Sequence, residues 1–176
     1  MTLIEEIQSE FEKCLINKCH ENVNDKYFEI IDDEVHKCYI NTNKDIKGQF
    51  RIINNDSKEI NFLAVDKCIF DNSCPPKRCD FILFDNSVFS FVEIKVPSRV
   101  SGRSILRNEA IEQLKSTIIE FLGLKLINKL GLEIEAIICL CVKKSYPTFT
   151  SSKQSRVKEF QDDYNVVLKE GNLKKY

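Results

Sequence analysis

Asp80, Glu93 and Lys95 have the residue types and the spacing for metal-dependent hydrolysis at phosphorus. They belong to two apolar runs, CDFILF and VFSFVEIK, which flank the tripeptide Asp-Asn-Ser at 85–87. These turn residues tolerate the backbone angles of a tight hairpin. With the last two of them as the loop, strand pairing places Asp80 opposite Glu93, and strand alternation puts Lys95 on the same face as Glu93.

Two opposed carboxylates destabilise a strand pair, and burial increases that cost. A Mg²⁺ ion, or Mn²⁺ in its place, would offset it, with Asp80 and Glu93 as ligands. Lys95 would hold a phosphate or orient the attacking water. The alternative is an ordinary cross-strand salt-bridge cluster on a solvated face. Apolar neighbours on the same face, such as Ile82 and Phe91, favour the metal site, because buried charges are rarely retained without a partner.

Hydrophobic periodicity predicts the elements that position these residues. We expect helices over 3–19 and 104–122, the second ending at Gly123, and strands over 61–71 and 133–142. A second helix is expected near 26–40, followed by a polar stretch through Gln49. The tail from 150 is predicted to form a last helix, then the short run VVL and a basic end.

The length of 176 residues suits one domain, and the composition is that of a folded globular chain, 43% hydrophobic and 30% charged. Lys and Arg number 26 against 27 Asp and Glu, so any nucleic-acid contact must come from a local patch. The amino terminus lacks the features of a secretory signal, and the longest apolar run, 136–142, is far short of the roughly 20 residues that span a bilayer. We therefore expect a cytoplasmic protein without a membrane segment.

Eight cysteines in a cytoplasmic chain are expected to be thiols or metal ligands rather than disulfides. Cys68, Cys74 and Cys79 are the zinc candidate, although their spacing lacks the paired C-x2-C knuckles of structural zinc sites. The other five lie in apolar segments and are expected to pack in the core: Cys14, Cys19, Cys38, Cys139 and Cys141. A redox or zinc-sensing role for the cysteines stays open as a third functional reading.

Asp80, followed after twelve residues by Glu93-Ile94-Lys95, resembles the motif of the PD-(D/E)XK nuclease superfamily. The predicted order of helix, three strands, helix and strand is similar too. The departure is Cys79, which stands where the motif has proline. The resemblance implies an α/β fold with a restriction-endonuclease-like three-layer core, a central mixed β-sheet flanked by helices. It covers a core of about 1–145, leaving 146–176 as an extension of a single domain, 1–176.

The resemblance also implies two further site residues. Many members carry a glutamine in the helix after the E-x-K strand, which makes Gln113 the fourth catalytic candidate. Some supply a glutamate from the first helix, and Glu10 flanks the apolar face there. The alternative for Gln113 is a solvent-facing helix position.

Basic residues in and just before the predicted helix over 104–122 are candidates for binding a phosphate backbone. The alternative is that they are simply solvated. They are Arg99, Arg103, Arg107 and Lys115. Asp66, within an apolar run, is either structural or placed to support a metal ligand.

The function implied by the resemblance is a metal-dependent nuclease with nucleic acid, foremost DNA, as substrate. Restriction, repair and phage defence are the roles of such proteins. The alternative is a nuclease-fold subunit that is catalytically silent or depends on a partner, which the near-neutral charge favours. Relatives that cut both strands often dimerise, so a homodimer or a larger complex with a protein partner is in keeping with either reading.

Overall fold

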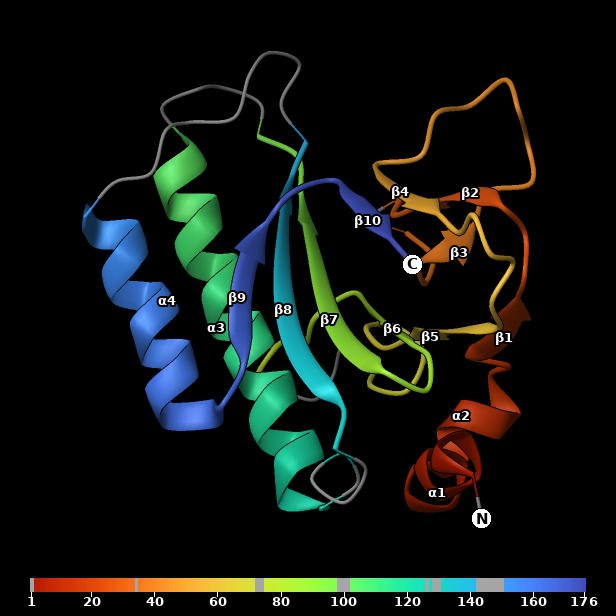
Figure 1. The fold of residues 1–176 in the computed structure, drawn as a ribbon, viewed down its shortest axis with the longest axis horizontal. Helices are drawn as coiled ribbons and strands as arrows, with labels where there is room; N and C mark the ends of the chain where they lie inside the picture. Colours follow the sequence, from red (N-terminus) through yellow and green to blue (C-terminus); the bar gives the residue numbers. More distant parts are fainter. Residues whose placement is uncertain are drawn as a thin grey trace.

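The chain folds into a mixed α/β structure built on two β-sheets (Figure 1). The computed structural model describes residues 2–33, 35–71, 75–97, 102–125, 127, 131–141 and 151–176. The mixed α/β class predicted from the sequence is confirmed, as is a central sheet containing both parallel and antiparallel strands.

The larger sheet has the strand order β1-β5-β6-β7-β8-β9 in the described part of the chain. Strands β5, β6 and β7 form an antiparallel meander with β1 at its edge, whereas β7, β8 and β9 run parallel. Parallel neighbours need a crossover, and a helix precedes each of the last two strands. The bounds are β1 (His20–Val23), β5 (Ile60–Ala64), β6 (Phe81–Phe84), β7 (Val88–Lys95), β8 (Glu133–Leu140) and β9 (Val167–Glu170).

The smaller sheet has the order β10-β4-β2-β3, and it replaces the helix predicted near 26–40, which is wrong. Its strands are β2 (Tyr27–Ile31), β3 (Tyr39–Ile40), β4 (Phe50–Ile53) and β10 (Leu173–Lys175). The runs YFEII and FRII are rich in aromatic and β-branched residues, which favour a pleated, half-buried surface over a helix. The carboxyl-terminal extension adds β9 to one sheet and β10 to the other, so it is integral to both.

The helices are α1 (Leu3–Glu10), α2 (Glu12–Ile16), α3 (Arg103–Gly123) and α4 (Ser151–Tyr164). The single helix predicted over 3–19 is broken at Phe11, whose backbone leaves the helical region. The break lets its ring pack 5.3 Å from that of Phe70 and 5.4 Å from that of Phe121. A bilayer-spanning helix is absent from the described segments, where each helix is too short or too polar.

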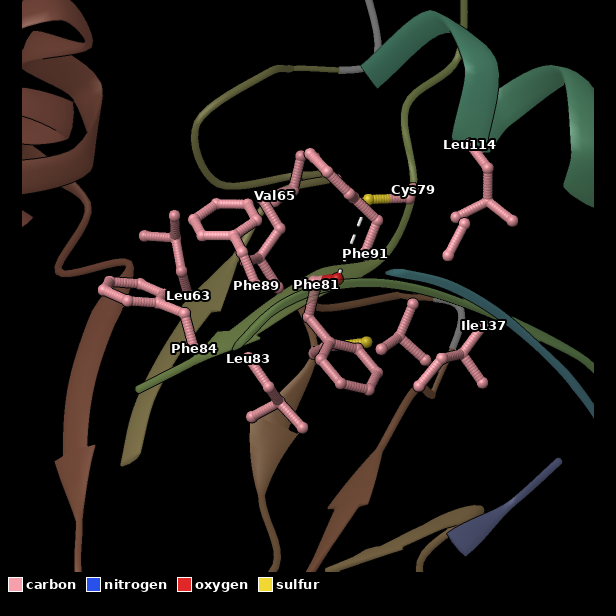
Figure 2. Packing of buried hydrophobic residues seen from close by; sticks show 14 of the residues in the cluster. Leu63, Val65, Cys79, Phe81, Leu83, Phe84, Phe89, Phe91, Leu114 and Ile137 are labelled. Atoms are coloured by element: carbon pink, nitrogen blue, oxygen red, sulfur yellow. Dashed lines mark hydrogen bonds between the residues drawn. The ribbon is translucent and has the colours of Figure 1, made fainter. Parts of the chain in front are cut away.

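The two faces of the larger sheet are covered differently. Helices α3 and α4 lie on one side of it and the smaller sheet on the other (Figure 1). Phe91 of β7 packs 5.7 Å from Phe121 of α3, whereas Phe81 of β6 packs 5.6 Å from Phe50 of β4. Figure 2 shows Leu114 pointing from α3 toward the larger sheet, whereas Phe81 points away from α3, on the opposite face of that sheet. Helices on both faces were expected, and the second face carries strands instead.

The cysteines depart from the prediction that they are thiols or metal ligands rather than disulfides. Cys19 and Cys68 form a disulfide, which ties the start of β1 to the segment after β5. Cys79 is buried, and its thiol donates to the carbonyl of Phe81 (Figure 2). Cys74 lies outside the described residues. The predicted zinc triad therefore loses Cys68 to a covalent bond. The other cysteines predicted in the core, apart from the partly exposed Cys141, are buried.

Phe121→Ala is expected to lower the free energy of unfolding by about 3 to 5 kcal/mol, because the ring contacts Phe11, Phe89 and Phe91 and its loss leaves a cavity. Ile119→Ala is the matched control on the same helix. That side chain is exposed, so its removal should change stability by no more than about 0.5 kcal/mol. Urea unfolding measures both, and equal losses would contradict this packing.

Candidate metal centre

The hairpin of β6 and β7 brings two carboxylates together. Phe84 pairs with Phe89 and Phe81 with Val92, which is the predicted register, and its continuation by one residue sets Asp80 opposite Glu93. The turn is held by Asp85, whose side chain accepts hydrogen bonds from the backbone of the loop. Register in a hairpin follows from its turn, so this short loop determines where the two acids meet.

Asp80 lies directly before β6, and it is buried. Its Oδ2 accepts a hydrogen bond of 2.6 Å from the backbone N–H of Ile94. Burial raises the pKa of Asp80 to about 7, with the negative charge of Asp32 adding to the effect. The carboxylate is therefore costly to ionise unless a positive charge lies beside it.

Glu93 is fully buried on β7, and neither of its oxygens has a hydrogen-bonding partner within the described part of the chain. The Lys95 Nζ lies 2.6 Å from Oε1, close enough for an ion pair, but the geometry is not that of a hydrogen bond. Burial and the adjacent Asp80 charge raise the pKa of Glu93 well above its usual range. A bound divalent cation would satisfy these oxygens, so the donor set fits Mg²⁺ or Mn²⁺.

Lys95 and Gln113 are joined across the sheet and helix α3. The Lys95 Nζ donates a hydrogen bond of 2.6 Å to Gln113 Oε1, and Gln113 Nε2 donates one of 3.0 Å to the carbonyl of Arg78. Gln113 thus faces the site rather than solvent. Burial alone would lower the pKa of Lys95, but the Glu93 carboxylate outweighs it and raises the pKa, so the ammonium stays charged.

These side chains line one cleft of about 800 Å³. Among the described residues, acidic side chains around it outnumber basic ones, since the acids include Asp32, Asp66, Asp71, Asp80, Glu93 and Glu109 and the bases are Lys67, Lys77, Arg78 and Lys95. An excess of negative charge attracts cations and repels a phosphate backbone. A phosphate would therefore enter this cleft more readily with a divalent cation than without one.

Asp32 is a cleft residue that the sequence reasoning missed. It follows β2 directly, in the segment predicted to be helical, and one of its carboxylate oxygens lies within 4.8 Å of a carboxylate oxygen of Asp80 and of the Cys38 sulfur. The three side chains could together hold a metal ion. The sequence offered one signal for it: Asp32 directly follows the apolar run YFEII, just as Asp80 directly precedes the apolar run FILF.

The other candidate residues lie elsewhere or are already paired. Glu10 ends α1 with an exposed side chain and is not among the residues that line the cleft. Asp66 does line the cleft, 4.0 Å from the Lys67 ammonium. Among the basic candidates, Arg103 is partly buried at the start of α3, while Arg99 falls outside the described residues.

Arg107 and Lys115 are engaged in ion pairs within the molecule. The Arg107 guanidinium lies 2.9 Å from Glu170 of β9, and the Lys115 ammonium lies 2.5 Å from Glu159 of α4. Both pairs join α3 to the carboxyl-terminal elements. A phosphate backbone would have to compete with these carboxylates for the two cations.

The chain matches no protein-family model, no curated protein and no solved structure. Its function is therefore inferred from the chemistry of the cleft.

Metal-free protein is expected to lose stability as the pH rises from 5 to 8. The folded Asp80 keeps its proton up to a pKa of about 7, whereas an unfolded aspartate releases it near its ordinary pKa of 3.8. Because the folded state binds the extra proton between these values, stability falls with rising pH, by about 3 kcal/mol from this group alone. Urea unfolding in EDTA at the two pH values measures the loss.

Asp80→Asn should remove most of this loss, while Asp45→Asn, in an exposed loop, should retain it. Mg²⁺ should stabilise the wild type more at pH 8 than at pH 5, because ionised carboxylates bind it. The same pH dependence in wild type and Asp80→Asn would contradict the placement of the buried carboxyl.

Proposed function

We propose that this chain is a metal-dependent nuclease of the PD-(D/E)XK type that hydrolyses phosphodiester bonds, with DNA as the first substrate class to test. The observation that carries the proposal is the fully buried Glu93, which lies opposite Asp80 and beside Lys95 and whose oxygens accept no hydrogen bond from the described residues. Buried carboxylates with unsatisfied oxygens are rare unless they bind a metal or act in chemistry.

In this function Asp80 and Glu93 hold Mg²⁺ or Mn²⁺. When bound, the ion supplies Lewis acidity for attack on phosphorus and for the departing oxygen. Lys95 keeps its proton, so it serves as a cation that holds the phosphate or orients water. Gln113 acts through Lys95: its amide is anchored on the Arg78 carbonyl and fixes where the ammonium points.

The order of elements supports the same type of fold. An amino-terminal helix precedes the antiparallel strands β5, β6 and β7, and then α3 crosses over to the parallel strand β8. The restriction-endonuclease-like core has this order of helix, three strands, helix and strand. A role in phage defence, restriction or repair extends the proposal by analogy with that type of protein.

A partner-dependent subunit is the second candidate, and a specific observation favours it. The net charge is −1, and two of the four basic residues expected to grip nucleic acid, Arg107 and Lys115, are paired with Glu170 and Glu159. Proteins that bind nucleic acid alone draw most of their affinity from such cations. A second copy or another protein would then supply the grip on the backbone.

The test is cleavage of plasmid, linear and single-stranded DNA and of RNA, with Mg²⁺ or Mn²⁺ against EDTA. Lys95→Ala and Asp80→Ala should each lower the rate by about a hundredfold or more, because each removes a group that acts on the phosphate or the ion. Lys44→Ala and Asp45→Ala, both exposed in the loop after β3, are matched controls and should retain the wild-type rate.

Circular dichroism of each variant separates lost chemistry from lost folding. Metal-dependent cleavage that persists in Lys95→Ala and Asp80→Ala would contradict the proposed site. Absence of cleavage by folded wild type on every substrate would contradict a stand-alone nuclease and favour the partner-dependent subunit.

A further inference from the structure

Beside Asp32 and Asp80, which line the cleft, lies the buried thiol of Cys38, a donor type that Mg²⁺ does not favour. We infer that Asp32, Cys38 and Asp80 form a second cation position, suited to a thiophilic ion such as Zn²⁺ rather than Mg²⁺. One ligand atom from each of the three side chains lies within 4.8 Å of the others. The position shares Asp80 with the proposed magnesium site, and its remaining ligands come from the smaller sheet.

The smaller sheet places two of these ligands by register. Ile31 of β2 pairs with Tyr39 of β3, and the next antiparallel position sets Asp32 opposite Cys38. The larger sheet does the same for Asp80 and Glu93 at the start of β6. Two antiparallel pairs, one from each sheet, therefore bring Asp32 and Cys38 next to Asp80.

Asp32 is held in position through its backbone. The Gln49 side chain accepts a hydrogen bond of 3.1 Å from the Asp32 N–H and donates one of 2.8 Å to the Asp32 carbonyl. Gly48 lets Gln49 come this close, because a Cβ at position 48 would lie 2.6 Å from the Cβ of Glu29. This clamp fixes the backbone of Asp32 at the edge of the cleft.

Burial distinguishes this position from a surface group of acids. Cys38 and Asp80 are buried, and Asp32 is mostly so. Beside them lies Glu93, fully buried, whose oxygens accept no hydrogen bond from the described residues and are offset by one ion pair, with Lys95. Its charge acts on the Cys38 thiol together with those of Asp80 and Asp32. A buried carboxylate without hydrogen bonds in the cleft is a sign, separate from the three-residue geometry, that a cation belongs there.

The donor types select the ion. Zn²⁺ binds thiolate at about 2.3 Å and carboxylate at about 2.0 to 2.2 Å with four ligands, so three side chains and a water in the cleft complete its shell. Mg²⁺ prefers oxygen alone. On binding, the Cys38 proton passes to solvent and the sulfur becomes the ligand. The positive charge of the Lys67 ammonium, 3.8 Å from Asp32, disfavours binding of a metal cation at this position. The negative charges of the acidic side chains around the cleft favour such binding.

Because Asp80 belongs to both positions, an ion on Cys38 should displace Mg²⁺ and inhibit the nuclease. This consequence rests on the proposed function, whereas the binding itself does not. The experiment is therefore a binding measurement with Cd²⁺, a thiophilic probe whose bond to thiolate gives an ultraviolet charge-transfer band. The full chain is titrated without thiol reductants, which would compete for the metal.

One equivalent of Cd²⁺ should produce the band in wild type and in Cys14→Ser, a control that alters another buried free thiol. Cys38→Ser should abolish the band. Asp32→Asn leaves the thiol in place, so it should keep the band but weaken Cd²⁺ binding by about tenfold or more. It also tests the site if Cys38→Ser fails to fold.

A wild type without the band would overturn the inference, as would an undiminished band in folded Cys38→Ser or unchanged affinity in Asp32→Asn. The band in a wild type that cleaves no nucleic acid would support this metal position and count against the nuclease alone. Mg²⁺-dependent cleavage without the Cd²⁺ band would support the nuclease and count against this metal position alone.

Discussion

The burial of Glu93 opposite Asp80 is the constraint on which the site depends. Two carboxylates share a low-dielectric environment in which each opposes the ionisation of the other. Among the described residues, Lys95 forms an ion pair with Glu93, and Gln113 holds that ammonium in place. When both carboxyl groups are ionised, Lys95 balances one of the two charges, so a proton or a bound cation must balance the other.

Another buried glutamate shows how this chain provides hydrogen bonds and positive charge to a buried carboxylate that has a purely structural role. Glu135 of β8 is as deeply buried as Glu93, but it receives the Lys169 and Lys174 ammonium groups and the Ser90 hydroxyl. Burial would raise its pKa, and these partners outweigh burial and lower it. The cluster joins β8 to both carboxyl-terminal strands. Glu135 receives three hydrogen bonds, whereas Glu93 accepts none from the described residues, and this difference points to chemistry rather than to packing at Glu93.

The site could be predicted from the sequence where local rules determine the structure. The turn at 85–87 determines the register of the hairpin, so the pairing of Asp80 with Glu93 followed from counting residues. The family resemblance indicated Gln113, and its position at the edge of the buried face of α3 is what lets it reach Lys95. The strand over 133–142 was found as β8 because a continuous apolar run indicates a strand buried on both faces.

The remainder depended on contacts between distant segments. The run YFEII fits a strand by its residue types, but β2 is stabilised by pairing with β4, some twenty residues later, which no local pattern reports. Asp32 and Cys38 come close to Asp80 only because this second sheet forms. The disulfide of Cys19 and Cys68 spans 49 residues and likewise depends on the fold. Arg107 was expected to meet phosphate, and its partner Glu170 lies on a strand from the far end of the chain.

The most direct measurement of the central claim is a crystal structure of the protein soaked with Mn²⁺, examined by anomalous scattering. The account predicts an anomalous peak between the carboxylates of Asp80 and Glu93, each within the bonding distance of about 2.0 to 2.3 Å expected for a hard divalent ion. Glu93 should then bind the ion through the oxygens that accept no hydrogen bond from the described residues. Mn²⁺ bound elsewhere, with Glu93 paired only to Lys95, would contradict the account.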